Sequence, residues 1–318
     1  MDKLIVSSSP HFNGGKTTQN IMLDVIIALV PAMIASVILF GFRAAVVILT
    51  CVASCVLSEY LCRKVMKRPQ TVGDLSCVVT GILLALNLPV TINPFIAIFG
   101  GVVAIVVVKQ MFGGIGQNFV NPALTARIIL LNSRMTHWVQ PFDYAATADA
   151  VTSATPLGIL KEGGGELPSY LDLFLGNTGG CLGETCALAL LIGGIYLIAR
   201  RVISPVIPVT YLATAAVFSA LFGRDPLFDL LSGGLMLGAF FMATDYTTSP
   251  LYFWGRVVFA IGCGALTMVI REFGSLPEGV SYSIILMNIL TPLIERYIKP
   301  QAFGALREKK RAKGGAEK

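Results

Sequence analysis

Long apolar stretches separated by short polar connections dominate the chain. Ten such segments can be recognised, at residues 21–42, 44–62, 75–90, 94–109, 119–131, 185–199, 202–222, 227–243, 251–271 and 280–298. Most approach the roughly 20 residues that a helix needs to cross the hydrocarbon core of a bilayer. The pattern therefore predicts an all-α integral membrane protein with about ten transmembrane helices.

Three of these segments are too short for a regular transmembrane helix: 75–90, 119–131 and 185–199. The first ends at Asn87, Leu88 and Pro89, and a proline disfavours helical backbone at its own position and at the residue before it. We therefore expect short or broken helices among the spans.

A weak internal similarity between the two parts of the sequence favours two halves of opposite orientation, with five spans each. Asp74 precedes a span that breaks at Asn87, and Asp229 precedes one that breaks around Thr244. Paired interrupted helices at matching positions are typical of inverted repeats, which hold their binding site near the middle of the membrane. We expect a first transmembrane repeat (1–131), a loop (132–182), a second repeat (183–299) and a basic tail (300–318).

The composition supports a membrane environment, since 55% of residues are hydrophobic and 13% charged, against about 25% charged in soluble domains. The net charge of +6 does not indicate a nucleic-acid partner, because eight of the 24 Lys and Arg residues lie between Arg296 and Lys318. We expect this tail to be solvated and to contact anionic lipid.

The distribution of Lys and Arg predicts the orientation. With a cytoplasmic N-terminus and ten spans, 18 of these residues lie inside and five outside. Positive charges in short loops accumulate on the cytoplasmic side. Both termini are therefore expected in the cytoplasm of a bacterium or archaeon, with the loop 132–182 outside the cytoplasmic membrane and the first span directing insertion without a cleaved signal peptide.

Metal-binding patterns are weak. None of the seven cysteines forms a CxxC pair or stands near a histidine with ligand spacing, so an iron–sulfur cluster or zinc held by this chain alone is not expected. A cluster shared with another subunit stays open as an alternative. Charged residues in or near spans are expected to be solvated or paired rather than to form a cation site, and Glu184 is expected to be structural. The charged residues in question are Asp24, Glu59, Asp74, Arg127, Asp229, Arg256 and Glu295.

The sharpest local signal is the segment DAVTSATPL, from Asp149 to Leu157, in the outer loop. It matches a flavinylation pattern: Asp, any two residues, Ser or Thr, Gly or Ser, Ala, Thr. By residue frequencies a match arises about once in 10⁵ positions or less often. The alternative is an exposed Ser/Thr-rich loop whose hydroxyl groups bond only to the local backbone.

This motif resembles the site at which a flavin transferase attaches FMN through a phosphoester to a threonine hydroxyl, which here is Thr155. Asp149, Thr152, Ser153 and Ala154 are then recognition residues, and the small neighbours Ser153 and Ala154 leave room for the transferase. GGIGQNFVNPALTARI (113–128), GAFFMATDYTTSP (238–250) and the N-terminal SSSPH extend the resemblance over nearly the whole chain. Together they resemble the D subunit family of the Rnf complex and, more distantly, the B subunit of the sodium-pumping NADH:quinone oxidoreductase.

The resemblance implies a fold similar to urea transporters, covalent FMN outside the membrane and a second, non-covalent riboflavin between the halves. Its candidate ligands are Asn118, Asn121 and Asp245, with Phe119 as a ring contact. The implied function is electron transfer in an ion-translocating ferredoxin:NAD+ oxidoreductase that moves Na+ or H+. Its partners are other membrane and peripheral subunits, and the chain itself holds no catalytic residues.

Two alternatives come from other functional classes. A urea- or ammonium-like channel, or another small-solute transporter, uses the same fold without redox chemistry, and a passive membrane anchor only holds other subunits. Neither explains the TSAT sequence of the outer loop. Because a fold does not determine a function, the presence of covalent flavin discriminates between them.

Overall fold

The computed structural model describes residues 17–133, 155–162, 167–274 and 278–299, and these contain helices and no strands. The first two helices, α1 (Thr18–Phe40) and α2 (Phe42–Val65), are separated by Gly41 alone. Gly41 adopts φ of 74°, a left-handed conformation that glycine reaches without a Cβ penalty. The chain therefore reverses between two long helices within a single residue.

The next helices of the first half are shorter, as predicted. After the turn η1 (Val72–Asp74), α3 (Ser76–Leu86) has 11 residues and ends at Asn87. The helix α4 (Pro94–Val102) continues as the π-helix η2 (Val103–Gln110), and α5 (Pro122–Asn132) again has 11 residues. Both α4 and α5 begin with a proline preceded by a capping asparagine, a combination that starts a helix sharply.

The second half contains α8 (Ala187–Ala199), α9 (Val206–Leu221), α12 (Phe253–Phe273) and α13 (Val280–Tyr297). The prediction of one continuous span over 227–243 is wrong. This region consists of α10 (Pro226–Leu231), α11 (Leu235–Leu237) and the π-helix η4 (Gly238–Met242). The chain breaks between α10 and α11, where Gly233 has φ of 66°.

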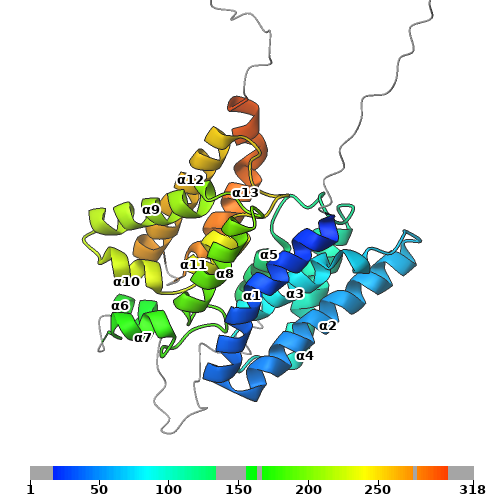
Figure 1. Ribbon diagram of the computed structural model, residues 1–318, viewed down its shortest axis with the longest axis horizontal. Helices are drawn as coiled ribbons and strands as arrows, with labels where there is room; N and C mark the ends of the chain where they lie inside the picture. The colour runs from blue at the N-terminus through cyan, green and yellow to red at the C-terminus, as the bar shows by residue number, and fades with distance from the viewer. Residues whose placement is uncertain (1–16, 134–154, 163–166, 275–277, 300–318) are drawn as a thin grey trace, which may run out of the picture.

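The two halves lie side by side and meet along α1 and α8 (Figure 1). Within the first half α2 packs on α3 and α4, and within the second α9 packs on α10 and α12. The short helices α6 (Pro156–Glu162) and α7 (Tyr170–Leu175) lie together beside α10. They occupy the lower side in Figure 1, opposite the side at which α1 begins and α13 ends.

Glycines allow the helices to approach closely where the halves meet. A Cβ atom on Gly193 of α8 would lie 2.1 Å from the carbonyl oxygen of Ala28 in α1. Within the first half, a Cβ on Gly81 of α3 would lie 2.8 Å from the Cα of Val52 in α2. Small residues at such contacts are typical of helix packing in membranes.

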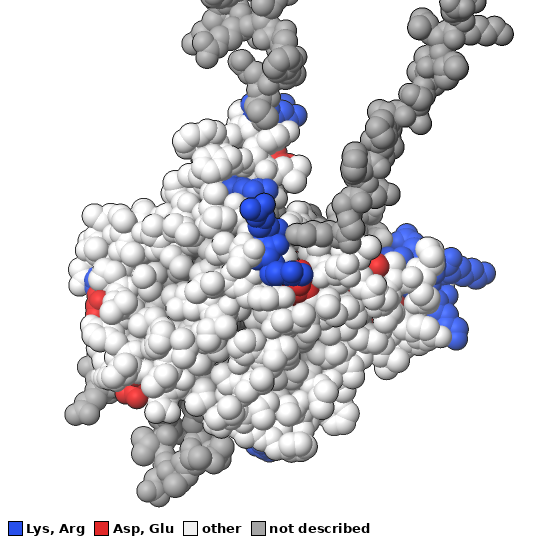
Figure 2. All heavy atoms as spheres, viewed as in Figure 1, with Lys and Arg blue, Asp and Glu red and all other residues white. Residues whose placement is uncertain are grey.

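The surface is that of a multi-pass membrane protein. Three of the described helices, α1, α2 and α12, are long and apolar enough to cross a bilayer in full. Large apolar side chains such as Ile38 and Phe42 face outward with 76% and 81% of their surface exposed. Figure 2 shows the resulting broad uncharged surface, with most of the visible Lys and Arg toward its upper and right-hand edges.

Candidate functional site

Thr155 lies immediately before α6 and caps its first turn. Its Oγ1 accepts a hydrogen bond from the backbone N–H of Gly158 at 3.1 Å, and its carbonyl oxygen accepts one from Ile159 at 2.9 Å. Leu157, two residues later, is buried with Leu173 of α7 and Phe228 of α10. The threonine hydroxyl is therefore half-buried on a helix that is anchored to the rest of the molecule.

The other residues of the motif, Asp149, Thr152, Ser153 and Ala154, lie outside the described residues. So do both histidines, His11 and His137. The structure thus places only the proposed attachment residue of the motif.

Thr155 lines a small cavity of about 10 Å³ with Glu184, Glu278 and the backbone around Gly179 and Gly180. This volume is close to the minimum for one water molecule. The cavity lies between Thr155, at the start of α6, and two acidic side chains of the second half, so residues that are distant in sequence meet there.

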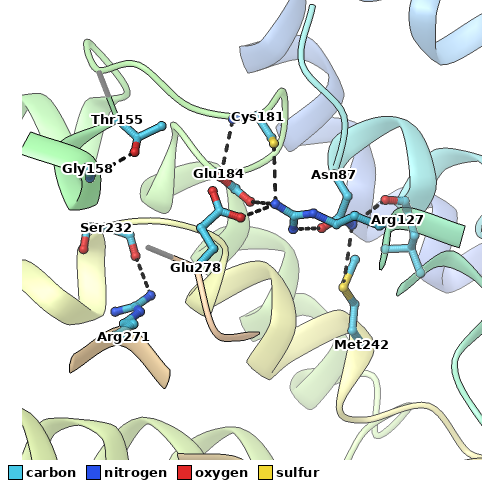
Figure 3. A network of polar contacts seen from close by, with 11 residues as sticks. Asn87, Arg127, Thr155, Gly158, Cys181, Glu184, Ser232, Met242, Arg271 and Glu278 are labelled. Atoms are coloured by element: carbon cyan, nitrogen blue, oxygen red, sulfur yellow. Dashed lines mark hydrogen bonds and ion pairs between the residues drawn. The ribbon is translucent and has the colours of Figure 1, made fainter. Parts of the chain in front are cut away.

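Beneath this cavity, Arg127 of α5 forms a buried ion cluster. Its Nη2 donates to Glu184 Oε1 at 2.9 Å and also to Glu278 Oε2, and its Nη1 donates to Asn87 Oδ1 at 2.7 Å. The side chain of Arg127 is 5% exposed and that of Glu184 is 2% exposed. Figure 3 shows Arg127 reaching toward the two carboxylates, with Thr155 on their far side. The cluster ties the interrupted end of α3 to the second half.

Cys181 adds a thiol to this cluster, with its Sγ 3.7 Å from Arg127 Nη2. The ligand atoms of Cys181, Glu184 and Glu278 lie within 4.8 Å of one another, a spacing that a metal ion could use. However, the guanidinium of Arg127 already donates to both carboxylates. The donor set is therefore that of an ion cluster rather than of a metal centre.

A second, larger cavity lies between the halves on the side at which α1 begins, with a volume of about 120 Å³. It is lined by Asn118 and Asn121 before α5 and by Asp245 after η4. The structure thus brings together three of the four residues predicted to bind riboflavin. Phe119 is not among the lining residues: it is 49% exposed, and its ring packs on Phe112 with centroids 4.9 Å apart.

The polar groups of these three residues are partly engaged. Asn121 caps α5: its Oδ1 accepts from the N–H groups of Ala123 and Leu124, and its Nδ2 donates to Met242 O at 3.4 Å. Asn118 Nδ2 donates to the carbonyl of Val120 at 3.1 Å. Asp245 accepts from the hydroxyl of Thr247 at 2.9 Å. Asn118 and Asp245 are therefore better placed than Asn121 to contact a ligand.

Lys109, which lines the same cavity, belongs to a buried ion pair with Glu59. Lys109 Nζ donates to Glu59 Oε2 and to Ser76 Oγ, both at 2.7 Å, and the Lys109 side chain is 4% exposed. Thr71 donates to the other Glu59 oxygen at 2.6 Å. The expectation that intramembrane charges are paired is therefore confirmed for Glu59, Arg127 and Asp229, the last bound by Arg224 at 2.8 Å.

The sequence singles out Arg127 but does not reveal the cluster around it. Glu184 is predicted only to be structural, and nothing marks Glu278, because the three residues lie far apart in the chain. The available signal is an arginine inside an apolar segment, which requires a buried partner.

Comparisons with known proteins agree on one family. A sequence profile described as the NQR2, RnfD, RnfE family matches residues 5–304. The chain is 52% identical over 313 residues to the D subunit of the Na(+)-translocating ferredoxin:NAD(+) oxidoreductase complex of Acetobacterium woodii, covering 98% of both chains. It is 42% identical to the D subunit of the proton-translocating ferredoxin:NAD(+) oxidoreductase complex of Clostridium ljungdahlii, covering 95% of this chain and 96% of the other. It is also 41% identical to the D subunit of the ion-translocating oxidoreductase complex of Stutzerimonas stutzeri, covering 91% and 92%.

Proposed function

We infer that this chain is the D subunit of an ion-translocating ferredoxin:NAD+ oxidoreductase, since it belongs to the family described as NQR2, RnfD, RnfE. The names of its relatives in Acetobacterium woodii and Clostridium ljungdahlii support this function over nearly the full length of the chain. Its role is to pass electrons between carriers held by other membrane and peripheral subunits, in a complex that moves Na+ or H+. The chain supplies binding and orientation of the carriers, as proteins do for redox cofactors.

The first carrier that we propose is FMN, joined to Thr155 by a phosphoester that a flavin transferase forms. The observation that carries this proposal is the coincidence of the DAVTSAT motif with a partly exposed threonine. Thr155 lines a cavity at the start of the anchored helix α6, and within the described part of the chain its Oγ1 accepts one hydrogen bond, from the N–H of Gly158. Small residues before it leave room for an enzyme to reach the hydroxyl.

The second proposed carrier is a non-covalent riboflavin in the interior cavity. Asn118 and Asp245 offer polar groups to an isoalloxazine edge, and Phe240 and Phe241 line the same space with aromatic rings. The volume of about 120 Å³ is below the roughly 300 Å³ of small-molecule pockets, so binding requires these side chains to move apart.

Two inverted repeats of a urea-transporter-like fold account best for the arrangement of helices. The contacts of α2 with α3 and α4 have counterparts in those of α9 with α10 and α12, and α1 and α8 pair with each other. Each half also contains an interrupted helix, α3 in one and α10 to η4 in the other.

We propose that the side bearing α6 and Thr155 faces outward and that both termini are cytoplasmic.

The redox function is tested by the fluorescence of denatured protein on a gel. When the chain is produced together with its flavin transferase, we expect a fluorescent band that survives denaturation, and we expect Thr155→Val to abolish it. Thr178→Val is the matched control, since Thr178 lines the same cavity outside the motif. A band that persists in Thr155→Val contradicts the attachment site, and a dark wild-type band favours the channel or transporter alternative.

A further inference from the structure

The buried cluster beneath Thr155 contains more negative than positive charge. Glu184 and Glu278 both accept from Nη2 of the single guanidinium of Arg127. The side chains of Arg127, Glu184 and Glu278 are 5%, 2% and 20% exposed, so water screens them weakly. Two carboxylates that share one site do not both ionise readily, because each disfavours the charge of the other.

The surrounding groups do not supply the missing positive charge. On the other side of Arg127, Nη1 donates to the neutral amide of Asn87 at 2.7 Å. Burial raises the pKa of the Cys181 thiol well above its ordinary value, so this group stays uncharged. Arg271 of α12 acts on Glu278 from a distance, but its guanidinium is already bound to the carbonyl oxygens of Asp229 and Ser232, at 2.7 and 3.1 Å. Within the described parts of the chain, Arg127 is the cation that forms ion pairs with these two carboxylates.

We propose that Glu184 and Glu278 together hold one exchangeable proton at neutral pH, and that this proton site responds to the charge of the flavin on Thr155. The first part stands on the geometry of the cluster alone. The second part rests on the proposed function, because it requires a flavin at Thr155.

The cavity between Thr155 and the two carboxylates offers a position for one water molecule that can exchange this proton. Its volume of about 10 Å³ admits roughly one water molecule, and Thr155, Glu184 and Glu278 all line it. Burial, followed by the nearby Glu278 carboxylate, raises the pKa of Glu184 above its ordinary value. Because both carboxylates accept from the same nitrogen of Arg127, we assign the proton to the pair rather than to one residue.

Electron and proton movements balance in the coupling step. An electron from a low-potential iron–sulfur protein, here reduced ferredoxin through the other subunits, adds to the flavin and makes it more negative. Reduction raises the affinity of the pair for its shared proton. Above the pH at which the pair has lost this proton beside the oxidised flavin, one proton from water therefore binds to a carboxylate oxygen of the pair, forming an O–H bond and offsetting the new charge. Oxidation of the flavin by the next carrier returns the proton to water.

The proton site is tested without the flavin. In full-length Thr155→Val protein, infrared difference spectra between neutral and alkaline pH are expected to show one protonated carboxyl group that loses its proton. Glu278→Gln added to this background is expected to remove the signal, because Arg127 then pairs fully with Glu184. Glu272→Gln is the control, since Glu272 is 36% exposed and pairs with Arg224. No protonated carboxyl group, or one that is unchanged in Glu278→Gln, overturns the proposal.

The coupling is tested on the flavinylated protein by titrating the midpoint potential of the covalent flavin against pH, with dithionite as reductant. We expect the potential to fall more steeply with pH in the wild type than in Glu278→Gln, by up to one additional proton per electron. Glu272→Gln is expected to behave as the wild type. Equal slopes of the midpoint potential against pH in all three proteins contradict the coupling. Displacement of the carboxyl proton when Na+ is added contradicts a site that binds only protons.

The readouts separate the two proposals. If no flavin is found on Thr155 while the infrared signal is present, the attachment site is wrong and the shared proton stands. If the flavin is present and the infrared signal is absent, the proton site is wrong and the redox function stands. The folding of Glu278→Gln is checked first by its elution as a single species on size exclusion. If it is poorly folded, Glu184→Gln, which removes the other carboxylate of the pair, serves as the second variant.

Discussion

At the scale of single residues, Arg127 is the charge on which the buried polar interior depends most. It bonds Asn87 from the first half and Glu184 and Glu278 from the second, with almost no exposure to water. A buried ion pair contributes little net stability when intact, since desolvation offsets attraction, but removing one partner leaves an uncompensated charge. The loss of Arg127 therefore lowers stability mainly because it leaves buried carboxylates unpaired, and less because its own hydrogen bonds are lost.

We expect Arg127→Met to lower the free energy of unfolding by about 3–5 kcal/mol, because the carboxylates lose their buried counter-charge. The measurement is thermal or denaturant unfolding in detergent. Arg200→Met is the control: its side chain is 58% exposed and pairs with Asp24, so the loss should be about 1 kcal/mol or less. Adding Glu184→Leu and Glu278→Gln to Arg127→Met should recover most of the lost stability, and no recovery contradicts this account.

The candidate site is predictable from sequence only in part, for a physical reason. Thr155 can be found because its chemistry is encoded locally, by neighbours that a transferase must read together. Asn118, Asn121 and Asp245 are grouped through family resemblance, and the structure brings them to one cavity. The Arg127 cluster escapes prediction because its partners lie 57 and 151 residues away in the chain. An isolated arginine predicts that it has a partner but does not identify it.

At the scale of helices, the interrupted elements position both cavities. The end of α3 supplies Asn87 to the Arg127 cluster, and the end of η4 leads to Asp245 at the interior cavity. Short helices at α3, α5 and α8 are predicted from segment length and from Asn87 and Pro89. The break between α10 and α11 is not, because Ser232, Gly233 and Gly234 lie within an otherwise apolar run and glycine alone does not specify where a helix ends.

The interior cavity yields a prediction at this scale. We expect Asn118→Leu and Asp245→Leu each to reduce at least severalfold the riboflavin released when the purified complex is denatured, because both remove polar groups that line the cavity. Phe119→Ala should leave the amount unchanged, since Phe119 lies outside the lining and half-exposed. The covalent flavin on the gel serves as an internal standard. Loss of riboflavin in Phe119→Ala alone would place the site elsewhere.

The contact between α1 and α8 leads to a second prediction at the scale of helices. Gly193→Val should disrupt the packing of the halves, because even a Cβ would lie 2.1 Å from the Ala28 carbonyl oxygen. We expect a loss of several kcal/mol and a low yield of monodisperse protein, measured by size exclusion of detergent extracts. In contrast, Gly73→Ala places its Cβ where nothing lies within 4 Å and should be tolerated. Equal yields of the two variants would contradict the close contact.

At the scale of the whole molecule, the positions of the helix ends make the orientation testable. Lys161 of α6 and Lys67, which follows α2, are both exposed. The helix α6 lies on the lower left side in Figure 1, and α2 ends on the upper right side. With the half-buried Cys62 and Cys186 replaced by alanine, we expect a membrane-impermeant maleimide to label Lys161→Cys in intact cells. Lys67→Cys should be labelled only after permeabilisation. The reverse pattern would place Thr155 in the cytoplasm and exclude an outer flavin.

The overall architecture can be predicted only to the level of a helical membrane protein with short and broken spans. Hydropathy indicates whether a segment prefers an apolar environment or water, so it identifies the apolar runs that become α1, α2 and α12. It does not report which helices are neighbours, and the pairing of α1 with α8 depends on glycines whose role is visible only once the backbones are in contact. The symmetry of the two halves therefore stays a prediction that the matched helix pairings support.

The arginine-centred cluster also constrains the order in which the chain is assembled. During synthesis Arg127 is made before either glutamate, and its first acidic partner, Glu184, follows 57 residues later. Until then the first half carries this cation without an acidic partner for it. We expect this half to depend on the insertion machinery, or to keep α5 outside the bilayer, until its counterpart is delivered. Two separately expressed halves should for the same reason accumulate only when they are produced in the same cell.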